Sequence, residues 1–387
     1  MTESEQLVQV AIEDHSTFIR EHAHVIAVAE SLPDSISSLN KLTKLVGERA
    51  ARWAWEQRSL RKRARERFPA ADQMFFLKES LEQASHPVIA SYHASKFPMD
   101  ELVVDCTTGI GADLIALARR GPVQGFDKSA IVIAYAKANC DALGLSTTLS
   151  CSDSLAAEWN TLYAFADPSR RIDGKRITEL SDYQPNVTDL VAKMKYLRLA
   201  GIKLSPLLSD QELESFGGRV EFVSFKGECR EACIWLGKDV QPGVFAVLVL
   251  ADGSTEELPR DDDLGTTHEA KAWIFDADPA AVRAHCLGTF CVPMLGDSPG
   301  YLTGDQKLDS PWLRAYQVIA TPRFDLSEIK KVIREQDLKT PEIKQRGTKQ
   351  DLIKLQKQLK SSGKTPCALI LWAHGKSIRC ALAKIPE

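Results

Sequence analysis

Short apolar segments alternate with helical segments from about residue 101 onward, and this alternation constrains the fold more than any other feature of the chain. The segments LVVD, VQGFD, TTLSC, YAFAD and GIKL have the length of β-strands, and the stretches between them have helical spacing. Parallel strands cannot be joined by a tight turn and need a crossover, usually a helix. The pattern therefore predicts βαβ units, an α/β fold and a parallel sheet.

The last strands of the sheet are expected to be antiparallel, unlike the parallel strands before them. After Ser209 and Glu212, which form a possible capping box, two apolar segments follow, VEFVSF and REACIWLG. Only a few residues separate these segments, so they predict an antiparallel hairpin.

The segments on either side of this region have a different character. Up to about Pro98 apolar residues recur at helical intervals, with proline breaks at Pro33, Pro69 and Pro87. Beyond about Lys238 strand-like and helical segments are mixed. A chain of 387 residues exceeds the size that one hydrophobic core usually serves. We expect a helical domain over 1–98, a sheet domain over 99–238 and a small α+β domain over 239–387.

The turn after the first strand, DCTTGIGAD, raises the question of a bound cofactor. A glycine-bearing turn between a strand and a helix can present backbone N–H groups to a ligand. The dinucleotide pattern requires GxGxxG, but after Gly109 and Gly111 the third position is Leu114. Asp105, at the end of the strand, would repel a pyrophosphate and would suit a cofactor with a cationic amino group. S-adenosylmethionine is such a cofactor.

Two more acids follow the next two strands, Asp127 and Asp153. Carboxyl ends of parallel strands meet along one edge, where α/β sheets bind ligands. Asp127 can accept hydrogen bonds from ribose hydroxyls and Asp153 from an adenine amino group. Each acid alone could equally be a helix cap. All three in this order favour a cofactor site.

These residues resemble a known pattern. DCTTGIGAD, GFDKS, CSDSL and FADPSRR are similar to the class I S-adenosylmethionine-dependent methyltransferases, whose Rossmann-like sheet has seven strands. Nearly the whole chain resembles a bacterial family that joins this domain to a helical N-terminal region and a C-terminal THUMP-like domain. The elements of that narrower resemblance are LEQAS, FADPSRR, GIKLSP, EFVSFKGECREACIWLG, DADPAAVRAH, GYLTGD and IKQRG.

The resemblance implies roles for particular residues. Asp105, Gly109 and Gly111 would hold the methionine part of the cofactor, Asp127 the ribose, and Asp153 with Ser154 the adenine. Further cofactor contacts are expected from Thr107, Asp113 and Lys128.

ADPSRR occupies the place where many amino-methylating enzymes carry D/N/S-P-P-Y/F/W. Asp167 and Pro168 match that motif and are the predicted catalytic residues, whereas Ser169 and Arg170 replace the second proline and the aromatic residue. This departure argues against methylation of an amino group on a stacked base. Expected acceptor contacts are Gln83, Ser85, Arg170, Arg171 and Lys203, although Gln83 and Ser85 could equally be an ordinary polar helix end.

Two basic segments flank the expected catalytic domain. Residues 58–67 hold six basic residues and one acid, and residues 328–364 hold eleven basic residues and five acids, in a chain of net charge −3. Such segments are either solvated helix faces or phosphate-contacting faces. With the THUMP-like resemblance they favour RNA as substrate, with tRNA and rRNA both open. The alternatives are a small-molecule or protein methyltransferase and a catalytically silent RNA-binding scaffold.

The remaining features indicate a cytoplasmic protein without metal or membrane contact. Nine scattered cysteines contain no CxxC pair, which favours reduced thiols over disulfides or zinc. The N-terminus is acidic where a secretory signal would be basic, and no apolar stretch approaches the roughly 20 residues of a membrane span.

Overall fold

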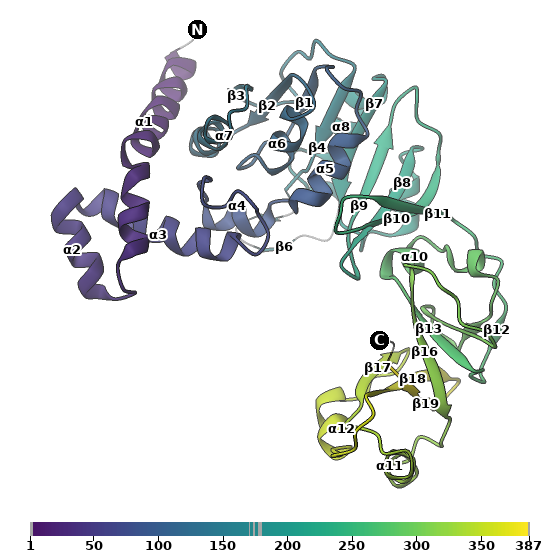
Figure 1. The fold of residues 1–387 in the computed structure, drawn as a ribbon. Coiled ribbons are helices and arrows are strands. Elements are labelled where there is room, and N and C mark those ends of the chain that lie inside the picture. The colour runs from purple at the N-terminus through teal and green to yellow at the C-terminus, as the bar shows by residue number, and fades with distance from the viewer. Residues whose placement is uncertain (1–2, 170, 173–174, 177–179, 386–387) are drawn as a thin grey trace. The chain divides into compact units, whose positions relative to one another are not determined.

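A computed structural model describes residues 3–169, 171–172, 175–176 and 180–385. The chain divides into two compact units. The first comprises residues 1–219, 233–242 and 251–253, and the second comprises residues 220–232, 243–250 and 254–387. Figure 1 labels the elements along the chain.

The first unit begins with five helices: α1 (Glu3–Ser31), α2 (Ile36–Val46), α3 (Glu48–Ala64), α4 (Lys78–Gln83) and α5 (Pro87–Ser95). α1 ends two residues before Pro33, as the sequence predicts. The break between α2 and α3 lies instead at Gly47, whose φ of 84° favours glycine. α1 packs against α3 and against α7 (Ala130–Ala142) (Figure 1).

Helices and sheet in this unit share one hydrophobic core. Buried side chains from α1 and α3, such as Ile26 and Leu60, belong to the same cluster as Val103 and Phe165 of the sheet. The division at residue 98 remains a prediction, but the side chains before and after it pack together.

The larger sheet has nine strands in the order β11-β10-β8-β9-β7-β4-β1-β2-β3. Their bounds are β1 Val103–Asp105, β2 Val123–Asp127, β3 Thr148–Cys151, β4 Tyr163–Ala166, β7 Leu199–Leu204, β8 Arg219–Phe225, β9 Glu228–Leu236, β10 Gly243–Val249 and β11 Thr255–Pro259. β3, β2, β1, β4 and β7 pair in parallel, as predicted. Between them lie α6 (Ala112–Ala118), α7, η1 (Leu180–Asp182) and α8 (Val187–Met194), and α9 (Asp210–Glu214) follows β7. A two-stranded sheet, β5 (Arg171–Ile172) with β6 (Lys175–Arg176), lies outside this sheet.

Nine strands replace the expected seven, and the strand count is therefore wrong. All seven predicted strands are present, but β10, assigned from the sequence to the C-terminal domain, joins the sheet beside β8. Its residues Ala246–Val249 are all buried. β10 covers the strand edge that β8 would otherwise leave unpaired. β11 pairs antiparallel with β10 although its side chains are mostly exposed and show no apolar strand pattern.

The predicted hairpin and capping box are both present. β8 and β9 are joined by Lys226 and Gly227, with φ values of 54° and 76°, as a tight two-residue turn requires. The Ser209 side chain accepts from the Glu212 N–H, and the Glu212 carboxylate accepts from the Ser209 N–H.

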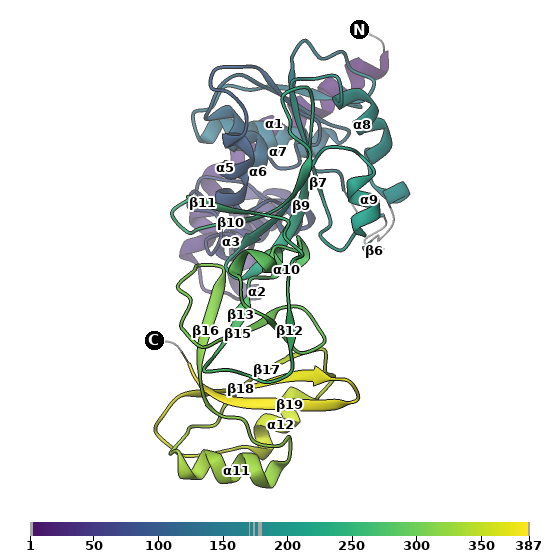
Figure 2. The ribbon, with the colours of Figure 1, turned by 90° about the vertical axis from the view of Figure 1, so that its right-hand side faces the viewer.

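The second unit contains a sheet of eight strands in the order β12-β14-β15-β13-β16-β19-β18-β17. The strands are β12 Thr266–Thr267, β13 Trp273–Ala277, β14 Met294–Leu295, β15 Tyr301–Gly304, β16 Leu313–Ala320, β17 Glu342–Arg346, β18 Cys367–His374 and β19 Ser377–Lys384. The helices are α10 (Pro279–Arg283), η2 (Leu287–Phe290), α11 (Leu326–Glu335) and α12 (Leu352–Gln358). α11 and α12 lie on one side of β17, β18 and β19 (Figure 2), where Ile329, Ile333 and Leu355 pack against Leu369 and Leu382.

No helix among the described residues is long and apolar enough to cross a membrane. Within the same residues, no group of three His, Cys, Asp or Glu side chains is arranged to hold a metal ion. All nine cysteines are free thiols.

Candidate active site

Two backbone N–H groups of the turn between β1 and α6 are already hydrogen-bonded within the protein. Gly109 and Gly111 have φ values of 54° and 94°, in the left-handed region that favours glycine. The Gly109 N–H donates to Oδ2 of Asp127 at 3.2 Å, and the Gly111 N–H donates to the carbonyl of Thr108 at 2.9 Å. A pyrophosphate would therefore find neither of these donors free, which agrees with the missing third glycine.

Asp105, at the end of β1, is the least satisfied acid of the site. It is 1% exposed, and its Oδ1 accepts a hydrogen bond from the Thr107 N–H at 3.1 Å. Its Oδ2 is buried and has no hydrogen-bond partner among the described residues. Burial, reinforced by the charge of Asp113, raises the pKa of the Asp105 carboxyl well above its usual range. A cationic group beside Oδ2 would satisfy both the oxygen and the charge.

Asp127 ends β2 and faces the same turn. Its Oδ1 accepts from the Ser129 N–H at 2.9 Å, while Oδ2 holds Gly109. Burial raises the pKa of this carboxyl, and the backbone hydrogen bonds oppose the shift. Each oxygen retains capacity for a second donor, such as a ribose hydroxyl.

Asp153 follows β3 and is paired with another predicted residue. Its Oδ2 lies 2.9 Å from Nζ of Lys128, and its Oδ1 accepts from the Leu155 N–H at 3.0 Å. The hydrogen bond from Lys128 holds the pKa of Asp153 below its usual value. Ser154 beside it is buried. An adenine amino group at Asp153 would compete with Lys128 for the carboxylate.

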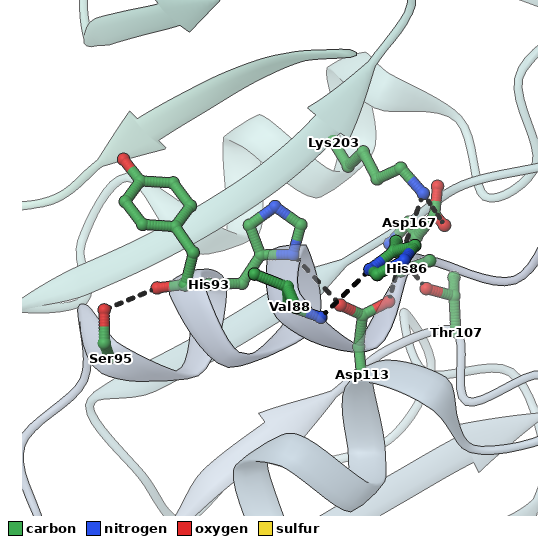
Figure 3. A network of polar contacts seen from close by, with 10 residues as sticks. His86, Val88, His93, Ser95, Thr107, Asp113, Asp167 and Lys203 are labelled. Carbon is green, nitrogen blue, oxygen red and sulfur yellow. Dashed lines mark hydrogen bonds and ion pairs between the residues drawn. The ribbon is translucent and has the colours of Figure 1, made fainter. Parts of the chain in front are cut away.

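A second polar cluster lies at the ends of β4 and β7 (Figure 3). Nζ of Lys203 donates to Oδ2 of Asp167 at 2.6 Å and to Oγ of Ser85 at 3.0 Å. Lys203 and Asp167 are largely buried, with side chains 16% and 29% exposed, so solvent screens this ion pair less than one on the surface. The structure thus brings together three residues that the sequence analysis placed at the acceptor.

Ser85 extends the cluster to Asp113. The Ser85 hydroxyl donates to Oδ2 of Asp113 at 2.6 Å, and Nδ1 of His93 lies 3.0 Å from Oδ1 (Figure 3). Burial opposes ionisation of Asp113, but the hydrogen bond and charge of His93, with Lys203 and Ser85, leave its pKa below the usual value. The carboxylate of Asp113 is therefore used by α5 and the loop before it, and its expected contact with the cofactor remains a prediction.

Thr107 joins the two clusters. Its N–H donates to Asp105, and its Oγ1 accepts from the Asp167 N–H at 2.6 Å. One residue thus ties the end of β1 to the end of β4.

The other predicted residues are distributed as follows. Pro168 is buried beside Asp167, and Gln83 is exposed at the end of α4. Arg170 lies outside the described residues, and of Arg171 only the backbone, in β5, is described.

His93 belongs to the cluster and was missed from the sequence. It is 1% exposed, and its ring centroid lies 4.7 Å from that of Phe165. Its link to Asp113 spans 20 residues and two helices. No local motif marks it, because only the packing of α5 on α6 creates the contact.

The basic segment 58–67 is partly structural. Arg61 is 8% exposed, and its Nε donates to the carbonyl of Met74 at 2.9 Å. Arg65 pairs with Glu30 at 3.0 Å and Asp72 at 2.7 Å. These two cations are engaged within the protein and therefore do not support the interpretation of this segment as a phosphate-contacting face.

Comparison with known proteins agrees with this geometry. Residues 313–379 match the family model described as THUMP domain-like. Two S-adenosylmethionine-dependent methyltransferases of Mycobacterium tuberculosis, from strains CDC 1551 and H37Rv, are each 30% identical over 344 residues, covering 85% of this chain and 94% of theirs. Both are described as uncharacterised.

The fold agrees as well. The crystal structure of a proposed methyltransferase from Porphyromonas gingivalis W83 is 18% identical, covers 95% of this chain and 99% of its own, and has a TM-score of 0.76. The buried, unpartnered Oδ2 of Asp105 suits the amino group of the cofactor that the relatives use. The chain carries a THUMP-like domain at its C-terminus and belongs to the S-adenosylmethionine-dependent methyltransferases.

Proposed function

We propose that this methyltransferase acts on RNA, with its acceptor presented at Asp167 and Lys203. The observation that carries the assignment of the acceptor end is the 2.6 Å Lys203–Asp167 ion pair at the ends of β4 and β7. The match of residues 313–379 to a THUMP-like model supports RNA as the substrate class.

The cofactor would lie along the ends of β1, β2 and β3. Asp105 would accept the amino group through its unpartnered oxygen, Asp127 would accept the ribose hydroxyls, and Asp153 with Ser154 would receive the adenine. Asp105 is expected to lose its proton when a cation binds, because the ion pair removes the cost of burying its charge. The turn of Gly109 and Gly111 shapes this end, with Thr107 fixing the Asp105 carboxylate.

S-adenosylmethionine supplies an electrophilic methyl group, so the protein must position an acceptor and manage its proton. Asp167 would orient the acceptor and take its proton where it has one. Lys203 would hold the carboxylate in place and favour its charged form. Thr107 fixes the backbone of Asp167 relative to the cofactor end. Pro168, buried next to it, would limit the freedom of that loop.

The experiment is transfer of a labelled methyl group from S-adenosylmethionine to fractionated tRNA and rRNA from cells that lack the protein. We expect label in one RNA fraction, sensitive to ribonuclease, and nucleoside analysis would identify the acceptor atom. Asp167→Asn is the matched variant: it should abolish transfer while keeping cofactor affinity within a few-fold. Label that enters only protein or small molecules would refute the RNA assignment.

A further inference from the structure

Two sequence elements that the methyltransferase site does not use line one pocket of the second unit, and a third lies against them. DADPAAVRAH contributes Asp276 and Asp278 and IKQRG contributes Lys344 and Arg346, while Gly300 of GYLTGD lies beside Arg346 without lining the pocket. The pocket has a volume of about 570 Å³ and is also lined by residues 307–315. This volume lies within the range of small-ligand sites.

Arg346 is held in one geometry by four neighbours. Its Nη2 donates to Oδ1 of Asp276 at 3.0 Å and to the carbonyl of Ala277 at 3.3 Å. Its guanidinium carbon lies 5.6 Å from the ring centroid of Tyr301. Gly300, with a φ of +122°, leaves the space that the guanidinium fills, since a Cβ there would lie 2.5 Å from the guanidinium carbon. Because its neighbours fix its conformation, the Arg346 side chain is preorganised to bind a ligand.

The two inner cations of the pocket share Asp276. Nζ of Lys344 lies 3.0 Å from Oδ2 of Asp276, whose other oxygen accepts from Arg346, and Lys344 has a second, longer contact of 3.8 Å with Glu342. Nε and Nη1 of Arg346 donate to none of the described residues. Arg346 therefore keeps guanidinium donors that suit an oxyanion.

The rim adds two more cations. Lys307 is exposed. Arg314 is 46% exposed, forms a long, 3.7 Å ion pair with Glu342 and lies 5.3 Å from the ring centroid of Tyr316. Among the acids of the pocket, Asp309 is exposed, and Asp278 is engaged by the Ser224 hydroxyl at 2.7 Å and the Ala280 N–H at 2.8 Å. The lining holds four cations, Lys307, Arg314, Lys344 and Arg346, and three acids, Asp276, Asp278 and Asp309, so its formal charge is positive even with every acid ionised.

One lining residue of the pocket carries a buried, unsatisfied donor. Trp312 lines the pocket, and its Nε1 is buried without a hydrogen-bond partner among the described residues. Buried polar groups are nearly always satisfied, so such a group calls for a ligand or a water molecule. The rings of Trp312 and Tyr301 are 2% and 1% exposed, which leaves neither of them open for stacking on a base.

We propose that this pocket binds a backbone phosphate of RNA, with Arg346 as its fixed donor and Lys307 and Arg314 as rim contacts. The inference rests on the proposed RNA function and deepens it, because it gives the second unit its own contact with the substrate. Since no aromatic face is offered, binding here is independent of base sequence.

The test measures binding of a fluorescent single-stranded oligoribonucleotide to the full chain at several salt concentrations. Lys307→Gln with Arg314→Gln removes two rim charges. Lys376→Gln with Arg379→Gln, at exposed positions of the same unit outside both basic segments, removes one lysine and one arginine charge as the matched control. We expect the rim pair to weaken binding roughly 10-fold or more and to reduce the salt slope by about 1.4, at about 0.7 per contact. Equal losses in both pairs would overturn the proposal.

Gly300→Ala tests the pocket without changing charge. It should displace the Arg346 guanidinium and weaken RNA binding, with the folded state checked by circular dichroism. Should this variant fail to fold, the rim pair still decides the question. Full affinity in a folded Gly300→Ala protein would contradict the role of Arg346.

Two further measurements distinguish the possible sources of the phosphate, and distinguish a failure of this inference from a failure of the proposed RNA function. Inorganic phosphate and AMP, added as competitors, should displace the oligonucleotide only weakly, and displacement by AMP at comparable concentration would assign the pocket to a free nucleotide. If the unmodified chain binds S-adenosylmethionine but no RNA, the RNA function and this inference both fail. If it binds RNA and the rim pair matches the control pair at Lys376 and Arg379, only this inference fails.

Discussion

Replacement of Asp105 by asparagine should change stability and cofactor binding in opposite directions. The carboxylate is 1% exposed, one oxygen has no partner, and burial raises its pKa well above the usual range. A group whose pKa is higher in the folded state costs stability as the pH rises above its unfolded value, about 4 for aspartate. An asparagine carries no such cost at neutral pH.

The size of the gain follows from the burial. Each pKa unit corresponds to about 1.4 kcal/mol. An unsatisfied buried group costs roughly 1–3 kcal/mol when it is neutral and more when it is charged, so the asparagine amide is cheaper to bury than the carboxylate. Asp105→Asn should therefore raise the free energy of unfolding of the cofactor-free protein by roughly 1–3 kcal/mol at pH 7, which is about 2–4 °C in Tm per kcal/mol for a unit of this size. The gain should vanish below about pH 4, where the unfolded carboxyl is protonated as well.

Cofactor affinity should fall in the same variant. Loss of a charged partner for the amino group costs about 1.5–3 kcal/mol, which corresponds to a roughly 10- to 150-fold higher Kd. The assays are thermal unfolding with and without S-adenosylmethionine, and calorimetric titration. Asp113→Asn is the control, because both Asp113 oxygens are bonded and its pKa is lowered, so that variant should lose stability. A lower Tm for cofactor-free Asp105→Asn, or a Kd within twofold of the original, would refute the reasoning.

Three other outcomes follow from the same geometry. Cofactor binding should release protons near the raised pKa of Asp105 and tighten as the pH rises through it, which titrations in buffers of different ionisation enthalpy would detect; equal heats in all buffers would argue against it. Lys203→Met should lower kcat roughly 100-fold with cofactor Kd unchanged, and Lys203→Arg should restore part of it; a loss of cofactor affinity instead would make Lys203 a structural residue. The stability lost in Asp113→Asn should shrink as the pH falls below about 4 and through the lowered pKa of Asp113, and a constant loss in urea titrations would contradict the ionised form.

The sequence predicts the parallel half of the sheet because its signals are local. Strand length, helical spacing and the turn at Gly109 and Gly111 all lie within about 30 residues of one another, and β1 to β3 form as expected. The pairing of β10 with β8 could not be predicted, because the apolar pattern of β10 shows that it is buried but not against which sheet. An apolar run specifies burial, and only packing specifies the partner strand.

The site shows the same limit at the level of side chains. The positions of Asp105, Asp127 and Asp153 could be predicted because each lies at or just after the carboxyl end of a strand. The use of Asp113 by Ser85 and His93 could not, since the contacts span 28 and 20 residues with no fixed spacing. Arg61 lay in a basic run but is buried, because charge patterns do not report which face of a helix packs inward.

The hydrogen bond from Lys203 to Ser85 also sets an order of events during synthesis. The two residues are 118 positions apart, so at about 5–20 residues per second Ser85 waits roughly 6–24 s before its partner is made. Asp167 is likewise without its cation during part of that interval, and β7 is the last strand to enter the parallel half of the sheet. A nascent chain in which β1, β2 and β3 are complete would still lack the Lys203–Asp167 ion pair, so the proposed acceptor end can assemble only after about half of the 387 residues have been made.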